Sequence, residues 1–321
     1  MKAVILGTGA TIGTLGGKGG VKGFEERLNE VRPSWQDDYR NLKKAIDACK
    51  KSRDEKINLD QVWTRIDYYS KFRKILNGDY GSDASIELHK AVLVAYSFKK
   101  EISNICNKRH DFTLINELKE LGRGDALISF NWDTLAENIV MKMLEESLIQ
   151  SPDPDSSKYI QLIKPHGSLS WVHKKDGTVI FKEGSKPRLN PMTENDVDED
   201  ETEPLVLGAV PVKSEIIEEV QRGDHIKVFT TISDQWRETI RVISQADEVV
   251  VLGYSFPNED TYGRFLLREA VRNRPKKHRL PKIRYYALTE HRCDIEKAFR
   301  EIFSDEVNYE YMGKIKRAKE L

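Results

Sequence analysis

Short apolar runs separated by longer polar and amphipathic stretches form the main pattern of this 321-residue chain. Four runs are rich in β-branched or aromatic residues and have polar or turn residues at their ends: 2–6, 126–130, 248–252 and 283–288. Buried parallel strands have this composition. Two further strands are expected at 159–163 and 204–210. Because helical stretches separate the runs, the pattern predicts an α/β fold, a Rossmann-like parallel sheet flanked by helices.

Two segments are too long to be simple connections within such a sheet. The stretch between the first two strands is mostly polar and contains amphipathic sequence such as LHKAVLVAYSFKKEISNI. A crossover needs only about a dozen residues, so we expect an inserted helical subdomain over approximately 28–122. A second insert is expected at approximately 172–203, where HKKDGTVIFKEG is typical of a hairpin and TENDVDEDETE of a solvated acidic loop. The prediction is one domain over 1–321 with these two inserts.

Charge and cysteine content narrow the class of protein. Lys and Arg together equal Asp and Glu at 52 each, so no net field draws the chain to nucleic acid or to a membrane surface. Cys49, Cys106 and Cys293 are too few and too scattered for a disulfide framework or a zinc module, so we expect no metal. No run approaches the roughly 20 apolar residues of a membrane span. These features predict a cytoplasmic protein without direct nucleic-acid or membrane contacts.

The first predicted strand runs directly into a glycine-rich loop. Eight glycines fall within residues 7–23, and such density lets backbone N–H groups approach an anion closely. The spacing from Gly7 is G-x-G-x-x-x-G, with Ile12 where the dinucleotide fingerprint has its third glycine. The loop therefore predicts nucleotide-phosphate binding, and a flexible turn is the alternative.

Polar residues follow the second predicted strand at the edge where open parallel sheets bind ligands. Asn131 and Asp133 stand directly after the apolar run ALISF. Asp133 could instead be a helix cap, and Thr134 and Glu137 have the spacing of a capping box. Asn131 has no such structural explanation, so we interpret it as a candidate site residue.

Three more strand ends carry polar residues. His166 follows the strand at 159–163 and could be a general base near neutral pH or a structural histidine. Gly253 and Ser255 follow the strand at 248–252 and could contact a ribose or phosphate, while Asp260 could cap the next helix. A weaker signal follows the strand at 283–288, at Thr289 and Glu290.

Taken in order, these stretches resemble the sirtuin-like NAD-consuming proteins, in particular the bacterial branch found in NAD-depleting phage-defence systems. The resemblance spans nearly the whole chain. It rests on ILGTGAT, ISFNWDTL, KPHGSLSW, and Trp236 followed by ADEVVVLGYSFPNED. The order and spacing of these motifs are more specific than any one of them.

The resemblance implies that NAD is the substrate and assigns a role to each candidate residue. Asn131 would orient the attacking water and the nicotinamide ribose, and His166 would contact the ribose hydroxyls and act as a base. Asp133 would lie near the nicotinamide carboxamide. The remaining binding residues would be Gly7, Gly9, Ala10 and Thr11 around the pyrophosphate, and Gly253 and Ser255 at the adenosine half.

Two departures from the deacylating sirtuins indicate the branch. Those enzymes carry a four-cysteine zinc module, which three scattered cysteines cannot supply, so NAD hydrolysis ranks above deacylation. Their glycine loop also continues into Pro-Asp-Phe-Arg, where this chain has Lys22-Gly23-Phe24-Glu25. Phe24 could keep the shielding role over the nicotinamide ribose.

The expected activity is that of an NAD glycohydrolase giving nicotinamide and ADP-ribose, the effector of a bacterial defence or toxin system. An NAD- or ADP-ribose-binding sensor without turnover and an ADP-ribosyltransferase are the alternatives. Because uncontrolled NAD loss would kill the host, the family implies that a homo-oligomeric state or a regulatory protein partner gates the site. The predicted strands run from residue 2 to about 290, so no appended sensor domain is expected.

Overall fold

The structure is a computed structural model. It describes residues 1–15, 23–50, 59–71, 83–107, 112–174, 176, 178–184, 186–197, 202–206, 226–258, 260–275, 280–287, 292–303 and 307–315. Of the weaker sequence predictions, Thr289 and Glu290 lie outside the described residues, as do parts of the acidic run at 193–203.

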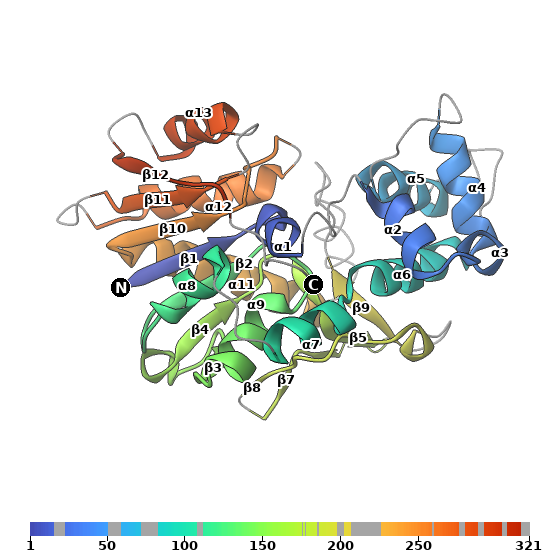
Figure 1. The fold of residues 1–321 in the computed structure, drawn as a ribbon, viewed down its shortest axis with the longest axis horizontal. Helices are drawn as coiled ribbons and strands as arrows, with labels where there is room; N and C mark the ends of the chain where they lie inside the picture. The colour runs from blue at the N-terminus through green and yellow to red at the C-terminus, as the bar shows by residue number, and fades with distance from the viewer. Residues whose placement is uncertain are drawn as a thin grey trace.

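A central sheet of seven parallel strands organises the molecule, in the order β12-β11-β10-β1-β2-β4-β3 (Figure 1). Its strands are β1 (Lys2–Leu6), β2 (Ala126–Ser129), β3 (Leu148–Gln150), β4 (Ile160–Ile163), β10 (Glu248–Leu252), β11 (Lys282–Tyr286) and β12 (Tyr309–Gly313). This is a Rossmann-like α/β fold, as the sequence pattern predicts. β1 lies at the centre, and the chain winds away from it first on the β2 side and later on the β10 side.

The predicted strands of the central sheet are confirmed to within two residues at each described end. Two described strands of the central sheet were not predicted: β3 has only three residues, and β12 lies beyond residue 290, the expected end of the sheet. The run at 204–210 was assigned wrongly to the same set of strands. Its described part belongs to β9 (Thr202–Val206), which pairs antiparallel with β5 (Gly167–Lys174) in a separate three-stranded sheet.

Alternating residues of the central strands build two buried layers, one on each face of the sheet. Val4 and Leu6 of β1 pack on the face covered by α8 and α9, whereas Ala3 and Ile5 pack on the face covered by α11, α12 and α13. All five residues of β1 are buried, as expected for a central parallel strand. The covering elements are α1 (Thr8–Thr14), α8 (Thr113–Lys119), α9 (Leu135–Asn138), η2 (Ile139–Met143), α11 (Ile226–Gln245), α12 (Thr261–Arg272) and α13 (Arg292–Phe303).

Between α1 and α8 the described chain is helical. Its helices are α2 (Phe24–Val31), α3 (Trp35–Asp38), α4 (Arg40–Cys49), α5 (Leu59–Lys71), α6 (Asp83–Tyr96) and α7 (Lys99–Asn107). Figure 1 shows α2 to α6 beside the sheet, on the side toward which β1 runs. One buried cluster includes residues of these helices together with Val4 and Leu6 of β1, so helices and sheet share a core. The boundary of the helical insert at approximately 28–122 stays a prediction.

Small β elements follow the central strand β4. The hairpin expected at 173–184 forms between β5 and β6 (Val179–Ile180), where His173 pairs with Val179. A two-stranded ribbon, β7 (Lys182–Glu183) and β8 (Lys186–Pro187), comes next. The short helices η3 (Ser156–Lys158) and η4 (Glu194–Asp196) complete the described elements. The limits of the second insert, approximately 172–203, stay a prediction.

Candidate active site

The strands β10, β1, β2 and β4 are neighbours, and their carboxyl ends deliver the predicted site residues to one edge. Leu6 of β1 pairs with Leu252 of β10 and with Ser129 of β2, so these three strands end level with one another. The connections diverge on the two sides of β1, which makes the β1–β10 boundary a topological switch point. In open α/β sheets this is the position where ligands bind.

The loops after β1 and β10 pack directly against each other at this switch point. The amide of Gly7 donates to Leu252 O at 3.0 Å, and the amide of Gly9 donates to Gly253 O at 2.8 Å. Gly253 has φ +61°, and a Cβ there would lie 2.1 Å from the amide nitrogen of Ala10. Glycine is therefore required at position 253 both by the backbone conformation and by the close approach of the two loops.

The glycine loop offers fewer free amides than its sequence suggests. Besides the two bonds across the loops, the amide of Ala10 donates to Gly7 O at 2.9 Å. Three of the amides expected around a pyrophosphate are thus engaged within the protein. The glycines at 16, 17, 19 and 20 lie outside the described residues.

Asn131 is held in one orientation by the glycine loop. Its Nδ2 donates to Gly7 O at 3.0 Å and to Thr11 Oγ1 at 3.0 Å. Because a carbonyl only accepts, the Gly7 bond fixes which end of the amide faces β1. The remaining atom, Oδ1, is buried and has no hydrogen-bond partner among the described residues. A buried unpartnered acceptor is rare and needs an explanation, and a bound hydroxyl or water supplies one.

Thr11 connects Asn131 to Asp133. The threonine hydroxyl accepts from the Asn131 amide and donates to Asp133 Oδ2 at 2.8 Å. The other carboxylate oxygen of Asp133 accepts from the amide of Leu135 at 2.9 Å. The three side chains form a polarised chain from amide to hydroxyl to carboxylate, in which each bond strengthens the next. All three are buried, with at most 7% of each residue exposed.

The capping-box alternative at Thr134 and Glu137 is wrong. Thr134 occupies the N-cap position of α9 but its side chain makes no capping hydrogen bond, and Asp133 caps the helix through the Leu135 amide. Glu137 turns instead toward Lys164, with Oε1 2.6 Å from Nζ. Asp133 therefore combines its capping role with the contact to Thr11.

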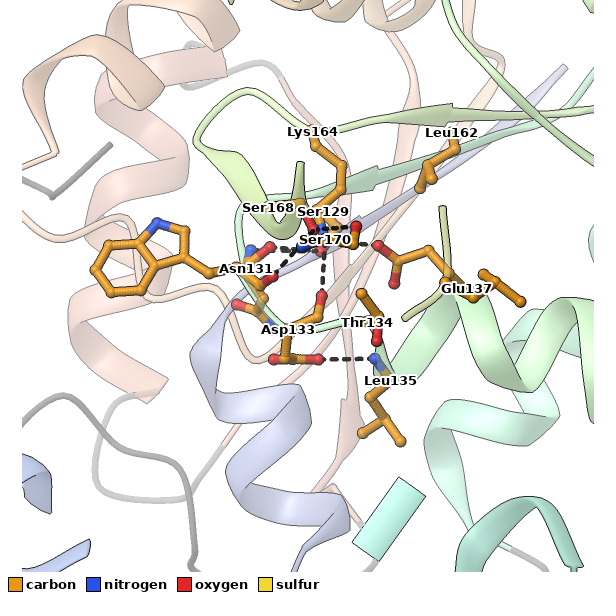
Figure 2. Close-up of polar contacts among 12 residues, drawn as sticks. Ser129, Asn131, Asp133, Thr134, Leu135, Glu137, Leu162, Lys164, Ser168 and Ser170 are labelled. Carbon is orange, nitrogen blue, oxygen red and sulfur yellow. Dashed lines mark hydrogen bonds and ion pairs between the residues drawn. The ribbon is translucent and has the colours of Figure 1, made fainter. Parts of the chain in front are cut away.

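Lys164 and Glu137 form a buried ion pair beside the Asn131–Asp133 loop (Figure 2). Lys164 Nζ also donates to the backbone oxygen of Asp133 at 2.7 Å. Burial raises the pKa of Glu137, and the nearby Lys164 ammonium opposes that shift. The sequence analysis missed this pair. Lys164 directly follows the apolar run YIQLI, and a lysine at the end of a buried strand is unusual enough to indicate a buried ion pair.

His166 is paired with a carboxylate that the sequence suggested only as a helix cap. Its Nε2 lies 3.2 Å from the carboxylate of Asp260, and its ring meets Phe130 edge to face at 5.1 Å. Asp260 also caps α12 by accepting from the Gly263 amide at 3.0 Å, so the capping prediction is confirmed. Both residues are buried, with 5% of His166 and 1% of Asp260 exposed.

Tyr254 completes the environment of Asp260. Its hydroxyl donates to Asp260 Oδ2, while its ring stacks on Phe130 with centroids 4.4 Å apart. Burial, with the Asp260 carboxylate as the second cause, raises the pKa of Tyr254 well above 10. The tyrosine therefore stays protonated and donates. The Asp260 carboxyl oxygens accept from Tyr254 and from Gly263, and when they also accept from His166 the histidine proton lies on Nε2.

The loop after β10 has an unusual backbone. Phe256 has φ +52° without being glycine, and it is buried between the rings of Tyr254 and Phe299. Bulky residues rarely adopt this conformation, and such strain concentrates at functional sites. Ser255 is exposed between Tyr254 and Phe256. Its position at the sheet edge agrees with the sequence prediction, but the ligand contact stays a prediction.

Phe24 lies in a buried aromatic cluster. Its ring stacks on Tyr96 with centroids 6.0 Å apart, and Tyr96 in turn lies 6.5 Å from the half-buried Trp132. Trp63 of α5 meets the same Trp132 at 5.8 Å. The described ring contacts therefore place Phe24 of α2 against Tyr96 of α6, which in turn lies near Trp132. The role of Phe24 in shielding the nicotinamide ribose stays a prediction.

No group of three or more histidine, cysteine, aspartate or glutamate side chains in the described ranges is placed to hold a metal ion. Within the same ranges, no helix combines the length and the apolar character needed to span a bilayer.

The fold and the site define a Rossmann-like α/β protein with a candidate ligand site at the carboxyl edge of its central strands. No protein-family model and no curated protein matches the chain. Among solved structures it is similar to three variants of a Sir2 homologue in complex with ADP-ribose, each covering 96% of this chain and 94% of the other. Identities are 16%, 14% and 16%, with TM-scores of 0.32, 0.34 and 0.31. These values are too low to carry an argument about activity.

Proposed function

We propose that this protein is an NAD glycohydrolase, which cleaves NAD to nicotinamide and ADP-ribose. One observation carries the proposal: Asn131 has a fixed amide and a buried unpartnered Oδ1, at the sheet edge to which β4 delivers His166 with its carboxylate partner. A pure binding protein has no need of a histidine oriented by a carboxylate. The resemblance of the four sequence motifs to sirtuin-like NAD-consuming proteins supports NAD as the substrate.

Asn131 is proposed to position the water and the nicotinamide ribose. Its Nδ2 is used up by Gly7 and Thr11, so only Oδ1 remains to accept a hydrogen bond from a hydroxyl or a water. Asp133 would lie near the nicotinamide carboxamide. The fixed orientation of the Asn131 amide would lower the activation barrier, because the amide does not have to reorient during the reaction.

His166 is proposed as the base. With the proton on Nε2 and directed at Asp260, the basic nitrogen is Nδ1. Asp260 then holds the ring orientation and stabilises the imidazolium that forms, as a carboxylate does for histidine in other hydrolases. Asp260 and Tyr254 are thus added to the residues that the sequence suggested for the site.

The bond that breaks joins C1′ of the ribose to the nicotinamide nitrogen. Its electron pair goes to the pyridinium ring, which leaves as neutral nicotinamide, and the ribose carbon acquires oxocarbenium character. The oxygen of the water bonds to C1′, and its proton passes to His166. Since the leaving group departs neutral from a cationic precursor, the proposed reaction needs no metal ion; exclusion of bulk water and a positioned nucleophile carry it.

The dinucleotide would lie along the loops after β1 and β10. The glycines there would allow close approach of a pyrophosphate beside Gly7, Gly9, Ala10 and Thr11. Because the amides of Gly7, Gly9 and Ala10 already donate within the protein, other donors would have to hold the charge of the pyrophosphate. Gly253 and Ser255 are proposed at the adenosine half.

The biological setting proposed for this activity is a cytoplasmic effector of a bacterial defence or toxin system. Free turnover of NAD would kill the host, so we propose that a homo-oligomeric state or a protein partner gates the site. Light scattering coupled to size exclusion, with activity measured across the same fractions, tests this. A monomer with full activity contradicts it.

Product analysis tests the proposed reaction. Purified protein is incubated with NAD, and the products are separated by chromatography. Equimolar nicotinamide and free ADP-ribose support a glycohydrolase. Nicotinamide with ADP-ribose attached to protein or nucleotide would show a transferase, and NAD that stays bound and intact for hours, with and without candidate partners, would show a sensor.

A further inference from the structure

Lys164 makes an unusual connection between two loops of the candidate site. It directly follows β4 and is 1% exposed, and its Nζ reaches the backbone oxygen of Asp133 at 2.7 Å. This oxygen belongs to the loop between β2 and α9, outside any strand or helix, and the Lys164 ammonium is a donor to it. A buried carbonyl without a donor is costly, so the lysine meets a definite need of this loop.

Glu137 is the counter-charge of Lys164. Its Oε1 lies 2.6 Å from Nζ, while its Oε2 is buried without a partner among the described residues. Burying an ion pair costs several kcal/mol per ion, and apolar residues of similar volume are often as stable or more so. Stability alone therefore gives a poor reason for this pair, and the bond to Asp133 O is the feature that an apolar pair could not provide.

The segment that contributes Lys164 holds the neighbouring carbonyl as well. Trp132 O accepts from the Leu169 amide at 2.9 Å and from Ser168 Oγ at 3.2 Å. Two consecutive carbonyls of the Asn131–Asp133 loop are thus anchored, one by Lys164 in the turn after β4 and the other by the first residues of β5. His166 lies in that same turn, two residues after Lys164, and Gly167 N closes it by donating to Lys164 O at 3.0 Å.

We propose that Lys164 is a positioning residue, which keeps the Asn131–Asp133 loop in register with the turn that carries His166, and that Glu137 is its buried counter-charge. The catalytic consequence rests on the proposed function; the structural consequence does not. Without this anchor the loop would shift relative to the histidine, and a displacement of about 1 Å is enough to cost about a hundredfold in rate.

Two variants separate positioning from stability. Lys164→Met removes the anchor and leaves Glu137 unpaired in the core, so it should lower both the urea unfolding midpoint and kcat for nicotinamide release. Lys164→Met combined with Glu137→Met replaces the pair with apolar side chains and should raise the unfolding midpoint above that of the single variant, because no unpaired carboxylate is left in the core; only the loss of the donor to Asp133 O remains. Arg272→Ala, at a side chain that is 68% exposed, is the matched surface control.

The expected result is a double variant more stable than Lys164→Met whose kcat nevertheless stays as low as that of the single variant, about 10- to 100-fold below wild type, with KM changed less than about threefold. Hydrogen exchange in peptides covering 130–137 should stay faster than in wild type. A double variant that regains wild-type kcat and wild-type exchange together with its stability would overturn the inference. If wild type releases no nicotinamide, the proposed function fails, and the exchange comparison still decides whether Lys164 positions the loop.

Discussion

Thr11 donates a hydrogen bond of 2.8 Å to Asp133, and through this bond a helix that follows β1 fixes the loop that follows β2. The same hydroxyl accepts from Asn131 at 3.0 Å. The orientation of the candidate catalytic amide therefore depends on a residue that is 120 positions away in the sequence.

The first prediction concerns this hydroxyl. Thr11→Val keeps the shape of the side chain but leaves Asn131 and Asp133 without their shared partner, so nicotinamide release should fall about 10- to 100-fold. Thr11→Ser retains the hydroxyl and should stay within about fivefold of wild type. Steady-state rates of the two variants test this, and a valine variant as active as the serine variant would contradict it.

The second prediction concerns the contact of two loops at the switch point. Gly253→Ala places a Cβ against the backbone of Ala10 at a positive φ, and should lower the free energy of unfolding by more than about 2 kcal/mol. Gly184→Ala is the matched control, since Gly184 has φ +65° but nothing within 4 Å of its added Cβ. Its cost should be about 1 kcal/mol, the strain alone. Equal losses in urea denaturation would show that the close approach is unimportant.

The third prediction concerns the partner of His166. Asp260→Asn can still cap α12 through its amide oxygen but has no negative charge to orient and stabilise the histidine. Nicotinamide release should drop about a hundredfold, while the unfolding midpoint changes little compared with Asp260→Ala, which also removes the cap. An asparagine variant that keeps full activity would remove Asp260 from the site.

The fourth prediction concerns Glu194 of η4, which contacts Arg32 and Tyr39 at the ends of helices α2 and α3. Glu194 accepts from Arg32 and from Tyr39, at 2.7 Å for the latter, and the hydrogen bond from Arg32 is the main cause of its lowered pKa. A lowered pKa gives stability that is present above the unfolded value of 4.5 and is lost as the pH falls through the folded value. Glu194→Gln should therefore be less stable than wild type by about 1 kcal/mol at pH 7, and the difference should shrink below pH 4.5.

Denaturation at several pH values checks this sign. Glu183→Gln, at a glutamate whose side chain is 67% exposed, serves as the control and should show little difference at any pH. A Glu194→Gln difference that grows toward acid pH would contradict the account.

Much of the central sheet could be predicted because its strands are short apolar runs buried on both faces. β1 and β10 match their predicted limits. Because the two strands end level with each other, Gly7 and Gly253 lie together at the carboxyl edge of the sheet, as predicted from their positions after the strands. β12 escaped prediction because an edge strand with the sequence YEYMG is only half buried and mixes aromatic with charged residues. β3 was missed because three residues are too few for a periodic signal.

The candidate site was predictable only in part. Strand ends placed Asn131 and His166 at one edge, but the polar partners that orient them depend on packing between distant segments. His166 and Asp260 are 94 residues apart, and the prediction that Asp260 caps a helix did not indicate its contact with His166. The buried pair of Lys164 and Glu137 was hidden for the same reason, since the spacing of Glu137 from Thr134 fitted a local capping box that tertiary packing overrides.

Asn131 and His166 are proposed to carry the cleavage of the nicotinamide–ribose bond of NAD, and a comparison of single variants tests this role. Nicotinamide release is measured for wild type, Asn131→Ala and His166→Ala, with Asn107→Ala as a surface control and with the affinity for ADP-ribose measured in parallel. We expect release by wild type, a loss of about a hundredfold or more in each site variant, and ADP-ribose affinities within about tenfold of wild type. Site variants that release nicotinamide as fast as wild type would contradict it.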